Sequence, residues 1–322
     1  MKTGKKIIGT IILPVITLAA VWGICSARGI ALFETQLNTM TFIRAIANVA
    51  LVTFALAINL NSGRFDFSVG SVALLSSVIS SRLALSLGTG PLPMLLLSIV
   101  FGELLGLLSG AVYVTVKLPP IIVSLAVALF YEGLAFALTG GHGVSFANSA
   151  KLLSFSTIPN FLIIIAVTLV LMVVIFDHTK FGYEYKALLS GQKVAVNTGI
   201  REVPNALICY ALAGALMGAQ GFISATTNGT IQMSLNFGSI SPMFMAFLPM
   251  FIGGFIGRFS NDKLGYLLGA VCSALISLLY VRLNVSSSMQ QITSALLLVG
   301  FLIYLNNEGK LKGLFVRREM KA

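Results

Sequence analysis

Long apolar stretches alternate with short polar segments along the whole chain. Each stretch holds about 20 mostly apolar residues, the length that an α-helix needs to cross a bilayer. The pattern predicts an all-α polytopic integral membrane protein with about ten transmembrane helices. The predicted spans are residues 7–25, 42–60, 67–87, 92–116, 119–139, 158–176, 204–225, 239–257, 264–281 and 291–305.

One long polar segment, residues 177–203, divides the predicted spans into two halves, residues 7–176 and 204–305. Residues 306–322 form a basic tail, and the whole chain, 1–322, is interpreted as a single transmembrane domain. Two halves of five helices each would lie in opposite orientations in the membrane. This is the inverted-repeat arrangement of many transporters. FDFSVGSVALL after the second span and LNFGSISPMFM at the eighth resemble each other at matching places. This short echo favours a 5+5 inverted repeat.

The composition agrees with a membrane protein. Hydrophobic residues make up 57% of the chain and charged residues 10%, against about 25% charged residues in ordinary globular domains. The formal charge of +11 could indicate nucleic acid binding, but no surface with interleaved aromatic and basic residues is visible. Cys25, Cys209 and Cys272 lie in apolar stretches without CxxC spacing. We therefore expect packing thiols, with neither a metal site nor a disulfide framework.

The positive charges predict the orientation. With the N-terminus in the cytoplasm, sixteen of the 21 Lys and Arg residues, Lys2 and Lys321 among them, fall on the cytoplasmic side, as the positive-inside rule requires. The exceptions are Arg28, Arg44, Arg82, Lys151 and Arg282. Both termini and residues 177–203 are thus predicted to be cytoplasmic.

Several segments carry a resemblance to a known family. NSGRFDFSVGSVALLSS resembles the SG-I-D-L-S-V-G-S signature of the membrane permease of ribose-type ABC importers, which also serve xylose, arabinose, galactose and autoinducer-2. ALICYALAGALMGAQGFISA and LNVSSSMQQITSALLLVGFLIYL are similar to two later runs of the family. A central loop of the family is matched at His178, Thr179, Gly182, Ala187, Gly191, Ala195, Gly199 and Ile200. FIGGFIGRFSNDKLG and Gln192 depart from the family pattern, which weakens any transfer of a particular substrate.

The resemblance implies a permease subunit that moves a monosaccharide or sugar derivative across the bacterial cytoplasmic (inner) membrane by alternating access. The implied partners are a separate ABC ATPase subunit, a second permease copy or a paralogue, and an extracytoplasmic solute-binding protein. The chain has no G-x-x-x-x-G-K-[ST] loop, so it is not expected to be an enzyme or to hold a cofactor. ATP-Mg is expected in the partner ATPase.

Residues 177–203 are the candidate for coupling to that ATPase. Basic residues alternate there with apolar ones, a pattern that predicts a short amphipathic helix docked in a groove. Its glycines would allow sharp turns at either side. The predicted coupling residues are Gly182, Ala187, Leu188, Gly191, Val194, Ala195 and Gly199. The alternative is an ordinary charged connector.

The polar segment between the second and third spans is the candidate substrate path, because Gly63 and two asparagines permit an unwound turn there. It is either a cytoplasmic turn or a kink at membrane depth. Asp66 has two interpretations: it caps the third helix or pairs with Arg64, or it contacts substrate. The predicted pathway residues are Asn59, Asn61, Asp66, Ser68 and Asn236.

Two acidic residues, Glu103 and Glu132, lie within predicted spans. A proton relay would give them a function, whereas protonation or pairing with Arg82 or Arg44 would make them structural. A relay would suit a secondary transporter driven by an ion gradient, the main alternative from another class. A third possibility keeps the ABC importer but changes its cargo to a nucleoside or branched-chain amino acid. The sequence leaves open whether the permease pairs with itself or with a paralogue.

Overall fold

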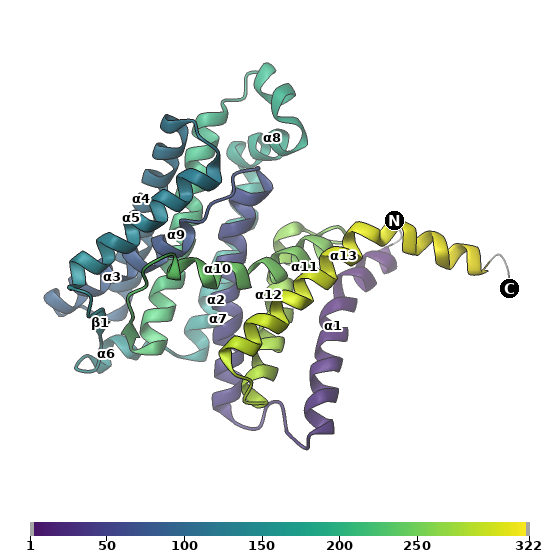
Figure 1. Cartoon of the computed structure of the whole chain (residues 1–322), viewed down its shortest axis with the longest axis horizontal. Coiled ribbons are helices and arrows are strands. Elements are labelled where there is room, and N and C mark those ends of the chain that lie inside the picture. The colour runs from purple at the N-terminus through teal and green to yellow at the C-terminus, as the bar shows by residue number, and fades with distance from the viewer. Residues whose placement is uncertain (1–2, 320–322) are drawn as a thin grey trace.

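The computed structural model describes residues 3–319 and is almost entirely helical (Figure 1). Among these residues, ten helices are long and apolar enough to cross a membrane, which confirms the predicted number. The elements are α1 (Thr3–Ala27), α2 (Gln36–Asn61), α3 (Val69–Leu87), α4 (Pro91–Val116), α5 (Pro120–Thr139), β1 (Val144–Ser145), α6 (Ala150–Leu153), α7 (Ile158–His178), α8 (Lys180–Asn197), α9 (Glu202–Asn228), β2 (Thr230–Ile231), η1 (Gly238–Ile240), α10 (Ser241–Met245), α11 (Phe247–Gly257), α12 (Asp262–Arg282) and α13 (Ser287–Glu319).

Glycines bring α4 and α9 into close contact. A Cβ atom added at Gly214 would collide with the backbone carbonyl of Gly102, and one at Gly218 would collide with the carbonyl of Ser98. Small residues allow such approach in membranes, where packing rather than water exclusion holds helices together. Gly214 and Gly218 thus let the backbones of α4 and α9 touch along one face.

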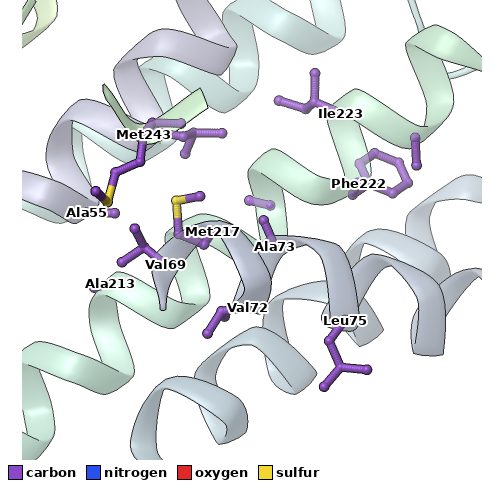
Figure 2. Close-up of a cluster of buried hydrophobic side chains, with 14 of the residues drawn as sticks. Ala55, Val69, Val72, Ala73, Leu75, Ala213, Met217, Phe222, Ile223 and Met243 are labelled. Carbon is purple, nitrogen blue, oxygen red and sulfur yellow. The ribbon is translucent and has the colours of Figure 1, made fainter. Parts of the chain in front are cut away.

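The largest buried cluster lies around α3. Figure 2 shows side chains from α2, α3, α9 and α10 meeting in it, among them Ala55, Leu75, Met217 and Met243. Four buried serines of α3 donate their hydroxyls to carbonyls three residues earlier in the chain; Ser71, for example, donates to the carbonyl of Ser68 at 2.8 Å. Helix α3 packs against α4, α5 and α9.

The eighth predicted span, 239–257, is composite. After α9 the chain forms β2, which pairs antiparallel with β1, and then returns to the middle of the molecule, where α10 lies (Figure 1). Asn236 and Phe237 have left-handed backbones, with φ of 56° and 65°. The helical residues that follow are divided among η1, α10 and α11. We call residues 229–240 the return segment.

Residues 177–203 contain α8, so the predicted short helix is present. The backbone is non-helical at Gly191.

Helix α13 continues through most of the predicted tail, to Glu319. Lys2 and Lys321, counted among the cytoplasmic charges, lie outside the described residues. The three cysteines are free and buried, as expected of packing thiols.

Candidate functional site

A cavity of about 600 Å³ lies between α3, α9 and the return segment. Its size falls within the usual range of small-molecule sites, roughly 300–1,000 Å³. In the part of the chain that the structure describes, its lining contains amide and hydroxyl side chains but no charged one. The polar lining residues are Ser77, Gln220, Ser224, Asn228, Thr230, Gln232, Ser234 and Ser239.

Helix α9 supplies a polar stripe to this cavity. Gln220, Ser224 and Asn228 are spaced four residues apart and line the cavity together, because residues i and i+4 share a helix face. None of these three residues was predicted from the sequence. The recurrence of polar residues at every fourth position of an otherwise apolar helix was the available signal.

The cavity runs from the exposed end of α9 to the start of α3. Asn228 and Gln232 are exposed at one end, whereas Gly70 and Ser239 line the other. A Cβ atom at Gly70 would collide with the carbonyl oxygen of Ser239, so this end is tightly packed.

Aromatic rings pack beyond that end of the cavity. The Phe65 ring lies 4.6 Å from that of Phe67 and 5.6 Å from that of Phe247, and Phe67 lies 5.8 Å from Phe244. Two of these rings come from the residues before α3 and two from the residues after η1. They pack the segment between α2 and α3 against α10 and α11.

The predicted pathway residues near that segment form a buried cluster and do not line the cavity. The Asp66 carboxylate accepts hydrogen bonds from the Ser68 backbone N–H at 2.9 Å, the Ser68 hydroxyl at 2.6 Å and the Asn59 amide at 3.2 Å. Burial raises the pKa of Asp66, and these hydrogen bonds oppose the rise. This is the geometry of an Asx-turn that precedes α3; the N-cap of α3 is Ser68, and no side chain caps the first turn of the helix.

The other predicted pathway residues lie elsewhere. Asn61 donates to the Tyr266 hydroxyl at 2.7 Å, and Asn236 is exposed in the return segment. Arg64, considered as a partner of Asp66, instead lies 3.9 Å from Glu202 at the start of α9. The structure therefore does not bring the five predicted residues into one site.

The two intramembrane acidic residues differ in their surroundings. Glu132 on α5 is 1% exposed and accepts hydrogen bonds from the return segment. Its partners are thus backbone N–H groups and a serine rather than Arg82 or Arg44. Glu103 is exposed on α4.

Helix α8 is fastened to the membrane helices by polar contacts. The Tyr185 hydroxyl donates to the carbonyl of Ile58 at 2.9 Å. Asp177, at the end of α7, accepts from Lys186 at 2.6 Å, Lys263 at 2.9 Å and Asn261 at 2.7 Å. One carboxylate thus joins α7, α8 and the start of α12.

The predicted coupling residues divide between two faces of this segment. Gly182, Leu188 and Ala195 are buried against the chain itself, and Ala187 is half-buried. Val194 is 70% exposed. The exposed apolar side chains of α8 are those of Tyr183, Leu189, Val194 and Val196; Leu188, assigned to the partner from sequence, packs inward.

Two of the predicted glycines make the turns expected of them. Gly191 interrupts the helix with an extended backbone at φ 172°. Gly199 has φ of 95°, a left-handed conformation that favours glycine. Together they set the exposed Val194 and Val196 on a separate short turn.

Comparisons with known proteins agree with this architecture. A family described as "Branched-chain amino acid transport system / permease component" matches residues 38–306. The autoinducer 2 import system permease protein LsrC of Yersinia pseudotuberculosis is 27% identical over 313 residues, covering 94% of this chain and 85% of that protein. LsrC of Yersinia enterocolitica is 26% identical over 313 residues, covering 94% and 83%.

A solved structure shares the fold. It is a metal-chelate type ABC transporter in an inward-facing conformation, 20% identical, with a TM-score of 0.51 over 94% of this chain and 99% of that one. At that identity the likeness concerns the fold alone.

Proposed function

This chain belongs to the family of permease components of branched-chain amino acid transport systems, and from that premise we propose that it forms the inward path for a sugar or sugar derivative in an ABC importer. It is an integral membrane subunit of an ABC transporter and not itself an enzyme. ATP hydrolysis belongs to a separate ATPase, with ATP-Mg bound there.

The observation that carries the choice of cargo is the uncharged polar lining of the cavity. Amides and hydroxyls such as Gln220, Ser224 and Asn228 can exchange hydrogen bonds with the hydroxyls of a neutral solute. An amino acid zwitterion would bring two charges into a lining that offers no counter-charge in the described chain, and an unpaired buried charge is costly. The relatives named for autoinducer 2 import support the same choice.

Coupling to the ATPase is assigned to α8. Leu189, Val194 and Val196 present apolar surface outside the membrane helices, and Lys186 and Tyr185 tie the helix to α7 and α2. A docked helix transmits force only if it is rigidly held, and these contacts hold it. Alternating access then follows from closure of the ATPase.

The complete importer requires further chains. A second permease copy or a paralogue would complete the path, and a solute-binding protein would deliver cargo from outside. We place the assembly in the bacterial cytoplasmic membrane with both termini of this chain in the cytoplasm.

The test is uptake into proteoliposomes that contain the permease, its ATPase and the binding protein. We expect ATP-dependent uptake of a sugar or sugar derivative that survives collapse of a proton gradient. Gln220→Leu should raise the KM for uptake several-fold, because the substitution removes hydrogen-bonding groups from the cavity lining. Gln291→Leu, a matched change at an exposed position of α13, should not.

Two results would contradict the proposal. Preferential uptake of leucine, isoleucine or valine would move the cargo to the amino acids named by the family. Uptake by the chain alone, abolished by an uncoupler or by Glu103→Gln, would favour the secondary transporter.

A further inference from the structure

The wall of the cavity depends on a buried acidic residue from another helix. Glu132 lies on α5, is 1% exposed, and sits in a span of mean hydropathy 2.2. An acidic side chain buried in a membrane protein needs specific partners, because lipid and apolar side chains offer none. Glu132 therefore calls for a structural or functional explanation.

The partners of Glu132 all belong to the return segment. One carboxylate oxygen accepts from the backbone N–H of Phe237 at 3.0 Å. The other accepts from the backbone N–H of Ser239 at 2.8 Å and from its hydroxyl at 2.5 Å. Both oxygens are thus engaged by a turn more than 100 residues away in sequence.

That turn has a backbone which needs such support. Asn236 and Phe237 are consecutive non-glycine residues with positive φ, a conformation that is costly for L-residues. Phe237 is also 39% exposed, so side-chain burial does little to hold it. Backbone hydrogen bonds from Gly238 to Leu235 and from Ile240 to Phe237 close the turn locally, and the hydrogen bonds from Phe237 and Ser239 to Glu132 tie it to α5.

The same turn forms part of the cavity. Ser234, Gly238 and Ser239 line it, and Ser239 also meets Gly70 at its closed end. A displacement of the turn would therefore change the cavity's shape and its closure together.

We propose that Glu132 is a positioning residue for transport: its carboxylate holds the return segment as a wall of the cavity and so sets the shape offered to the cargo. The proposal rests on the assignment of this cavity as the cargo path. It gives Glu132 a role without proton movement, in contrast to a relay.

The experiment compares Glu132→Gln with the matched control Glu103→Gln in the assembled transporter. A glutamine amide has one acceptor oxygen and places an NH2 group where the second oxygen accepted, so at least one N–H of the turn loses its acceptor. Ser234→Cys serves as the reporter in both backgrounds, because the native Cys25, Cys209 and Cys272 are all buried.

We expect the reporter to react faster with a small thiol reagent in the Glu132→Gln background. The rate should rise by up to about tenfold, the factor that corresponds to the loss of one intramolecular hydrogen bond. The KM for uptake should rise, while ATPase docking persists. Glu103→Gln should change neither the labelling rate nor the KM.

If the reporter reacts at the same rate in the Glu132→Gln background as in the background with Glu132, the proposal is overturned. If that variant does not fold, Ser239→Ala decides the matter, because it removes one donor and leaves the carboxylate in place. Faster labelling of the reporter in Ser239→Ala supports the proposal, and wild-type labelling overturns it. Faster labelling with an unchanged KM would instead refute the cavity as the cargo path. It would still show that Glu132 holds the return segment in place.

Discussion

Gly70, in the first turn of α3, packs directly against the carbonyl oxygen of Ser239 in η1. These two residues belong to the two segments that echo each other in the sequence, FDFSVGSVALL and LNFGSISPMFM. The contact closes one end of the cavity and leaves no room for a side chain at position 70.

Gly70→Ala should therefore impair both stability and uptake. Overpacking of this kind costs about 1–3 kcal/mol, and the colliding atom belongs to backbone, which cannot swing away. The matched control is Gly133→Ala on α5, where an added Cβ meets nothing within 4 Å and better helix propensity should be neutral or slightly stabilising. Thermal unfolding in detergent measures the difference; equal midpoints for the two variants would contradict the contact.

Asp66→Asn should change how stability depends on pH. Because burial raises the pKa of Asp66 above its ordinary value of 3.8, folding favours its neutral form. The stability contributed by that neutral form is present below pH 3.8 and is lost as the pH rises through the raised pKa. The asparagine variant lacks this titration, so its stability relative to the wild type should increase with pH, by at most about 1.4 kcal/mol per pH unit. Unfolding midpoints of the variant and the wild type, measured across a pH series, test this. If the variant becomes less stable relative to the wild type as the pH rises, the prediction is contradicted.

Asp177→Asn should loosen α8 from the membrane helices. The substitution leaves Lys186 and the largely buried Lys263 without their carboxylate, and we expect a cost of about 1–3 kcal/mol. Faster hydrogen exchange in residues 180–190 would report the loosening. Lys180→Ala breaks only the exposed pair with Glu184 and should change exchange little, since such pairs contribute about 0–1 kcal/mol.

Val194→Asp should abolish ATPase binding while the permease stays folded. Val194 is 70% exposed, so the new charge is solvated until a partner buries it. Leu188→Asp should instead destabilise the permease itself, because Leu188 is 8% exposed within its own chain. Pull-down of the ATPase together with thermal unfolding separates the two effects. Normal ATPase capture by a folded Val194→Asp variant would remove α8 as the docking element.

The predicted orientation can be tested with single cysteines. A cysteine at Lys193 should be shielded from an impermeant thiol reagent in intact cells, and one at Ser149 should be labelled. The reason is the excess of Lys and Arg on the side that contains α8. Labelling of position 193 from outside would reverse the topology.

The sequence by itself determined the ten spans, the short helix in residues 177–203 and the family. Transfer of a segment into lipid depends mainly on its own residues, so hydropathy locates the spans from local information. Asp66 and Ser68 are two residues apart and hydrogen-bond to each other, a local interaction. The predicted capping of α3 by Asp66 is not observed, because Ser68 is the N-cap and no side chain bonds to the first turn.

Only the tertiary structure decided the site. Glu132 meets Ser239 across more than 100 residues, and the cavity arises where α3, α9 and the return segment converge, which no local pattern specifies. The same holds for α8: its amphipathic pattern predicts an apolar face, but Leu188 is buried within the chain whereas Val194 is exposed. Which apolar residue a helix buries in its own protein and which it leaves for a partner depends on how the neighbouring helices pack.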